Sequence, residues 1–143
     1  MSKFISLITA VISSFGFGIY FKVNLKKLPF IALGGFLGWF VYNVSIYAGA
    51  KIFFSAMLAT ASLVVYSEIL ARVLKAPANT VLIPSIVPLL PGRWLYEMMS
   101  CIISGNLQTA FTCGATVLQT ILGISVGILL AMFVFYRLIR FFH

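Results

Sequence analysis

Four long apolar stretches, each of 18 to 25 residues, constrain this chain more than any other feature of its sequence. They cover residues 4–21, 29–49, 52–71 and 112–136. A helix of about 20 residues rises about 30 Å, which matches the hydrocarbon core of a bilayer. Charged residues make up 8% of the chain, too few to cover a soluble surface. The sequence therefore predicts an all-α, polytopic membrane bundle that forms one integral membrane domain over residues 1–143.

The first stretch has the length of a membrane span and is not followed by a small-residue cleavage site. We therefore expect it to be a retained helix and not a signal peptide.

The titratable residues exclude most catalytic chemistry. The chain has no Asp, two Glu, two Cys and one His, which is the terminal His143. No metal cluster and no Ser-His-Asp or Cys-His arrangement can be built from this set. The ten basic residues are scattered between apolar runs and form no nucleic-acid patch. We therefore predict neither an enzyme, nor a cofactor, nor a nucleic-acid partner.

A fifth stretch, residues 76–103, differs from the others because it holds four of the five prolines. Each interior proline removes a backbone N–H and displaces the carbonyl four residues earlier. Since Pro84, Pro88, Pro91 and Gly92 follow one another closely, we predict a fourth span that is broken at this motif. In lipid such a break persists only where protein or water covers the freed backbone groups.

The basic residues favour a crossing by this fifth stretch. If it crosses, nine of the ten divide 7 against 2 between the two sides and Arg93 stays inside the segment; if it re-enters, all ten divide 6 against 4. The positive-inside rule prefers the first division. We predict five spans in a bacterial plasma membrane, with the N-terminus outside and the C-terminus in the cytoplasm.

Small and polar residues recur at helical spacing along these spans. Close packing within the chain, or against a second subunit, is expected at the small faces. These faces are Ser6, Thr9, Ser13, Gly16 and Tyr20; Gly34 and Gly38; Ser55, Ala59, Ser62 and Tyr66; and Gly123 and Gly127. Two more polar stripes could line a cavity or form interhelical hydrogen bonds: Trp39, Asn43 and Tyr47, and Thr109, Thr112, Thr116, Gln119 and Thr120.

Two pairs of opposite charge lie four residues apart. Arg93 and Glu97 follow the proline motif; they could neutralise each other, or Arg93 could attract a carboxylate while Glu97 binds an amine or a coupling proton. We interpret Glu68 and Arg72 as an ion pair at the membrane boundary. Cys101 and Cys113 are expected to be apolar packing residues, although a disulfide between them remains an alternative.

The proline-rich segment resembles the threonine/serine exporter family, in the small half that carries the proline motif. The resemblance rests on the Pro-x-x-x-Pro-x-x-Pro-Gly run of residues 84–92 and on the neighbouring residues 71–77 and Tyr96. The Gly-rich residues 34–39 fit it too, as does Ser104-Gly105-Asn106, which precedes a Gly-rich last helix. It covers nearly the whole chain. The chain departs from the family pattern at Arg93, Trp94 and Glu97.

The resemblance implies an export function. Family members export small amino acids such as threonine and serine, and some two-subunit members export dicarboxylates such as succinate. It also implies a larger membrane subunit as partner; five similar spans in that partner would create an inverted repeat with the site between the halves. A non-transporting accessory subunit is the alternative. A homodimeric multidrug pump is disfavoured because the first two spans contain no carboxylate.

Both lines of reasoning place the substrate at the broken span. Carbonyls freed by the prolines could accept hydrogen bonds from an ammonium, and N–H groups of the restarting helix suit a carboxylate. The predicted substrate-binding residues are Asn43, Pro84, Pro88, Pro91, Gly92, Arg93, Tyr96 and Glu97.

Overall fold

A computed structural model describes the backbone of residues 2–141 and the side chains of Ile5 and of residues 8–137. Predictions that concern the side chains of Lys3, Ser6, Arg140 and His143 lie outside this part. The elements are α1 (Ser2–Tyr20), η1 (Leu25–Lys27), α2 (Leu28–Tyr47), α3 (Ile52–Val73), α4 (Asn79–Ile86), η2 (Val87–Leu89), α5 (Gly92–Ile103) and α6 (Leu107–Phe141). No strand occurs within residues 2–141, so the predicted all-α class is confirmed.

Three helical segments are long and apolar enough to cross a membrane: Leu25–Tyr47, Ile52–Val73 and Leu107–Arg137. The segments Ile8–Tyr20 and Asn79–Leu89 are apolar but shorter. The last helix begins at Leu107 and not, as expected from hydropathy, near Thr112. The backbone N–H of Thr109 donates to the side-chain oxygen of Asn106 over 3.3 Å, which stabilises this earlier start.

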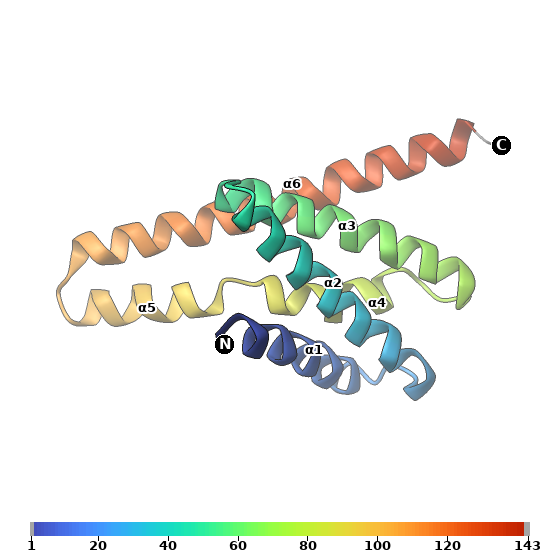
Figure 1. Cartoon of the computed structure of the whole chain (residues 1–143), viewed down its shortest axis with the longest axis horizontal. Helices are drawn as coiled ribbons and strands as arrows, with labels where there is room; N and C mark the ends of the chain where they lie inside the picture. Colours follow the sequence, from blue (N-terminus) through green and yellow to red (C-terminus); the bar gives the residue numbers. More distant parts are fainter. Residues whose placement is uncertain (1, 142–143) are drawn as a thin grey trace.

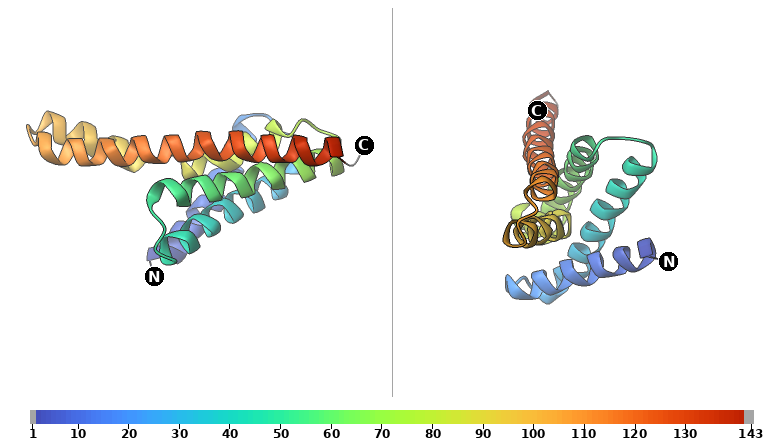
Figure 2. Two further views of the ribbon diagram at one scale, coloured as in Figure 1. Left: turned by 90° about the horizontal axis from the view of Figure 1, so that it is seen from above. Right: turned by 90° about the vertical axis from the view of Figure 1, so that its left-hand side faces the viewer.

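Helix α3 lies at the centre of the bundle, and the other helices pack on it or on one another. Helix α3 packs on α6 and α2, α1 lies against α2, and α4 with η2 is enclosed by α1, α2 and α3 (Figure 1). Helix α6 has 35 residues and is about 52 Å long, so it extends beyond the end of α3, which has 22 residues. As a result α5 and the first part of α6 form a hairpin that extends beyond the other helices (Figures 1 and 2).

The α3–α6 contact depends on two glycines of α6. A Cβ atom on Gly123 would lie 2.5 Å from the carbonyl oxygen of Phe53, and one on Gly127 would lie 2.6 Å from that of Met57. The two backbones approach so closely only because these residues have no side chain. The prediction that this small face packs within the chain is therefore confirmed.

The core lies around α3. Its residues Leu63 and Val64 are fully buried and meet Leu82 and Leu89 from the α4–η2 segment and Ile124 from α6. A second cluster joins Ile31, Leu70 and Val81 and fixes α4 between α2 and α3. These contacts hold the α4–η2 segment in the interior of the bundle.

The connections between helices alternate between the two ends of the molecule. Figure 1 shows the N-terminus and the turns after α2 and α5 towards one end. The connections after α1 and α3 lie towards the other end, together with the C-terminus.

Candidate functional site

The backbone between α4 and α5 is not α-helical. Pro84 lies inside α4, a short 3₁₀ turn from Val87 to Leu89 follows, and Leu90 is extended with φ −64° and ψ 136°. Helix α5 then begins at Gly92. Because Pro84 and Pro88 have no N–H, the carbonyls of Thr80 and Pro84 lack their usual α-helical donors.

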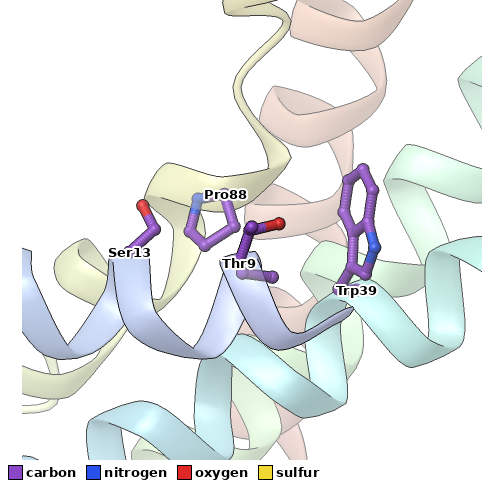
Figure 3. A pocket seen from close by; sticks show the side chains of 5 residues that line it. Thr9, Ser13, Trp39 and Pro88 are labelled. Carbon is purple, nitrogen blue, oxygen red and sulfur yellow. The ribbon is translucent and has the colours of Figure 1, made fainter. Parts of the chain in front are cut away.

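A cavity of about 310 Å³ lies against this segment. Pro88 of η2 forms one wall, and Thr9, Ala10 and Ser13 of α1 and Trp39 of α2 form the others. Figure 3 shows the Pro88 ring between the side chains of Ser13 and Thr9, with the indole of Trp39 beyond Thr9. Three elements far apart in the sequence therefore contribute to one hollow.

Close packing of α1 on α2 brings these walls together. A Cβ atom on Gly35 of α2 would meet the hydroxyl of Ser14 and would lie 3.2 Å from the carbonyl oxygen of Ala10. Any larger residue at position 35 would push α1 away. Gly35 therefore sets the distance between the hydroxyl-bearing face of α1 and the indole of α2.

Trp39 is held in place by two contacts on its own helix. Its ring stacks on that of Tyr42, with 5.5 Å between the centroids, and its carbonyl accepts a hydrogen bond of 2.8 Å from the amide nitrogen of Asn43. Its indole nitrogen is buried without a partner. The predicted site residue Asn43 therefore lies next to a cavity wall and supports that wall's backbone.

The cavity lining is uncharged and combines two hydroxyl groups with apolar surface. Thr9 and Ser13 offer hydroxyl groups, which can both donate and accept hydrogen bonds, and Trp39 and Pro88 offer ring surfaces. Such a lining suits a small polar solute that carries its own balanced charges.

Of the eight predicted site residues, Pro88 lines this cavity and the other seven do not. Pro84 and Pro91 are buried on either side of it in the sequence, whereas Gly92, Arg93 and Tyr96 are exposed. Arg93 and Glu97 form an ion pair with 2.8 Å between Nε and Oε1, and the Arg93 side chain is 82% exposed.

Sequence reasoning did not include Thr9, Ser13 and Trp39 among the site residues. It did place Thr9 and Ser13 on a small face and Trp39 on a polar stripe, both at helical spacing, which is the signal that could have found them. What it lacked was the convergence of α1, α2 and η2, which depends on long-range packing.

The remaining residues that the sequence singled out make separate contacts, and none of those described here lines the cavity. Hydroxyls of Thr112, Thr116 and Thr120 bond to carbonyls of their own helix α6. Arg72 lies over the ring of Phe135, 5.2 Å from its centroid. The thiols of Cys101 and Cys113 are free. Within the described residues, no three His, Cys, Asp or Glu side chains gather as metal ligands would.

Comparison with known proteins identifies the family. The family model described as "Threonine/Serine exporter, ThrE" matches residues 6–134. The chain belongs to this family. The resemblance recognised in the proline motif is thereby confirmed, and with it a transport role of the threonine/serine exporter type. The match includes every wall of the cavity, from Thr9 to Pro88. No solved structure matches this exporter-family chain.

Proposed function

We propose that this chain is the small membrane subunit of a secondary exporter for threonine- or serine-like amino acids, working with a larger partner subunit. The observation that supports this most directly is the cavity that carries the hydroxyls of Thr9 and Ser13 and lies beside Pro88, where the backbone is not α-helical. Secondary transporters hold their substrates at such discontinuous helices.

A zwitterionic amino acid would use both kinds of group near the break. Its ammonium would bind carbonyl oxygens that lost their helical donors, such as that of Pro84, together with the hydroxyls of Thr9 and Ser13. Its carboxylate would approach the first turn of α5, which begins at Gly92. Pro84, Pro88, Pro91 and Gly92 thus define the backbone of the proposed site.

The cavity favours an amino acid over a dicarboxylate. Among the described side chains that line it, none carries a positive charge. Arg93 is already paired with Glu97. A dicarboxylate would enter this hollow without a compensating cation, which is costly away from water.

We propose five crossings, with α4, η2 and α5 together forming the fourth. This segment of 25 residues, from Asn79 to Ile103, has the length of a span. The alternation of the connections between the two ends (Figure 1) supports an odd number of crossings. The excess of basic residues near the connections after α1 and α3 supports a cytoplasmic location for that end, in a bacterial plasma membrane.

The proposal of a partner subunit rests on the family resemblance and on the open cavity. Thr9 is exposed and Ser13 is half-buried, so one side of the hollow is not closed by this chain. A second protein at this face would complete the enclosure that a transported solute needs.

An export assay tests the site. Cells that express this chain with its partner are loaded with threonine, and efflux is compared for the wild type, Pro88→Ala and the double variant Thr9→Val with Ser13→Ala. We expect at least a tenfold loss of efflux in both variants at unchanged membrane levels. The matched control is Thr112→Val with Ser125→Ala, because both hydroxyls bond within α6 away from the cavity.

Full efflux by Thr9→Val with Ser13→Ala would contradict the site. Co-purification with the partner separates transport from an accessory role. If the variants lose efflux only because they no longer bind the partner, the chain is a stabilising subunit and the proposed substrate site is wrong.

A further inference from the structure

The basic side chains collect at one end of the molecule. Six of the eight in the described part belong to the connection after α1, to the end of α3 with the connection that follows it, and to the last part of α6: Lys22, Lys26, Lys27, Arg72, Lys75 and Arg137. Figures 1 and 2 show these three segments at the same end. The chain has two carboxylate side chains, and Glu97 is paired with Arg93 on α5. Because Glu68 is then the one carboxylate near these six basic side chains, this end has a strong net positive charge.

Two of these lysines occupy backbone conformations that normally require glycine. Lys22 has φ 52° and Lys75 has φ 46°. Each closes a helix, because the next residue donates back to the last turn: Val23 to the carbonyl of Gly18 over 3.1 Å, and Ala76 to that of Ala71 over 3.0 Å. The left-handed residue of this closing motif is usually Gly, since a Cβ atom strains it.

The opposite end of the molecule uses the same motif with glycine. Helices α2 and α5 close at Gly49 with φ 83° and at Gly105 with φ 77°. Ala50 and Asn106 make the corresponding hydrogen bonds, of 3.0 and 2.9 Å. Four helices thus end in one geometry, and a strained lysine replaces glycine only at the basic end. This contrast indicates that the two charges serve a purpose beyond ending a helix.

A hollow of about 230 Å³ lies beside Lys22. Phe21 and Val23, the residues on either side of Lys22, line it together with Asn79, Thr80, Ile83 and Pro84. Asn79 and Thr80 provide hydrogen-bond donors, and the other lining side chains are apolar. This combination fits a polar group attached to a hydrocarbon chain.

Exposed aromatic residues mark the depth of this end in the membrane. Tyr20 is 78% exposed and Tyr136 67% exposed, and both lie within two residues of a basic side chain. Tyrosines in such positions are typical of the headgroup layer of a bilayer. Lysines at that depth lie next to lipid phosphates, so an anionic lipid is a nearer partner for them than a soluble protein.

We propose that this basic end binds the headgroups of anionic phospholipids, and that one such lipid occupies the hollow beside Lys22, where this lysine compensates the charge of the lipid phosphate. Each lysine near an anionic membrane surface strengthens binding by a factor of about five, equivalent to about 1 kcal/mol. The strain at Lys22 and Lys75 is then offset by lipid binding. The proposal does not depend on which substrate the chain transports.

The test uses the full chain purified in neutral detergent. Phosphatidylglycerol, phosphatidylcholine or inorganic phosphate is titrated in, and bound lipid is counted by native mass spectrometry alongside the thermal unfolding midpoint. We expect phosphatidylglycerol alone to bind and to raise the midpoint. The variant Lys22→Gly with Lys75→Gly should weaken that binding roughly thirtyfold, yet have a higher midpoint than the wild type without lipid, because glycine relieves the strain.

Two further variants serve as controls. Lys22→Arg with Lys75→Arg keeps the charges and should retain the affinity, and Lys51→Gly at the opposite end should retain it as well. Equal affinity of wild type and Lys22→Gly with Lys75→Gly for phosphatidylglycerol would overturn the proposal. So would equal responses to phosphatidylglycerol and phosphatidylcholine, which would favour an acidic protein partner, or an equal response to inorganic phosphate.

Discussion

The hydroxyl of Ser85 donates a hydrogen bond of 3.2 Å to the carbonyl oxygen of Ile31, and so ties the proline-containing helix α4 to α2. Both residues are buried. Gly34 lies one turn further along α2, where a Cβ atom would meet the Ser85 side chain. This contact sets the position of α4 and therefore of Pro88 at the cavity.

The Ser85 contact predicts a strong coupling between positions 34 and 85. Gly34→Ala should lower the free energy of unfolding by about 1–3 kcal/mol, because the new methyl group overlaps the Ser85 side chain. Ser85→Gly should partly rescue it, with a coupling energy of about 1 kcal/mol in a double-mutant cycle. Unfolding in mixed detergent measures both. Strictly additive effects would show that the two positions do not contact each other.

The glycines of α6 predict a second packing effect. Gly127→Val should lower the unfolding free energy by about 1–3 kcal/mol, since its side chain would overlap the α3 backbone at Met57. Gly16→Ala is the control, because no atom outside its chain neighbours and its own helix backbone lies within 4 Å of the added Cβ. That change should be neutral or stabilising by up to about 1 kcal/mol. Equal unfolding midpoints for the two variants would contradict the observed α3–α6 packing.

The ion pair on α5 predicts the result of a charge exchange. Arg93→Glu combined with Glu97→Arg restores an ion pair at the same spacing, so we expect efflux within about threefold of the wild type. The reversed order is the more favourable one along a helix. Arg93→Glu alone should be more harmful, because it places two carboxylates one turn apart. Loss of efflux in the exchanged variant would instead indicate that Arg93 or Glu97 contacts the substrate directly.

The proposed topology predicts a labelling pattern. After Cys101 and Cys113 are replaced by Ser, single cysteines are introduced as Lys51→Cys, Ser104→Cys, Asn24→Cys and Lys26→Cys. A membrane-impermeant maleimide should label the first two in intact cells and the last two only after the membrane is opened. If Ser104→Cys, like Asn24→Cys, were labelled only after the membrane is opened, residues 76–103 would re-enter on the cytoplasmic side. The chain would then have four crossings.

Much of the architecture follows from local sequence. Apolar stretches long enough for a bilayer fix the helical class, because an exposed backbone group in lipid has no partner outside a helix. The boundaries of α2 and α3 lie within two residues of those expected, since a proline and a Lys mark their starts. The start of α6 was harder to predict because Asn106 caps the helix earlier than the apolar run begins.

The composition of the cavity could not be read from the sequence. The prolines indicate where α-helical geometry is interrupted, but Thr9, Ser13 and Trp39 reach Pro88 only through helix packing. That packing depends on Gly35 facing Ser14 and on Gly34 facing Ser85. Neither pairing is visible as a motif, because its members come from different helices.

By itself, then, the sequence determined that this chain is a helical membrane protein, which of its connections are basic, and which segment holds the prolines that disfavour a continuous α-helix. These properties follow from hydropathy, charge and the missing N–H of proline, all of which act within a few residues. Only the tertiary structure decided which side chains line the cavity beside Pro88. It also decided that Arg93 does not line this cavity but forms an exposed ion pair with Glu97. The physical reason is that close approach of helices is set by shape complementarity between distant residues, which no local pattern contains.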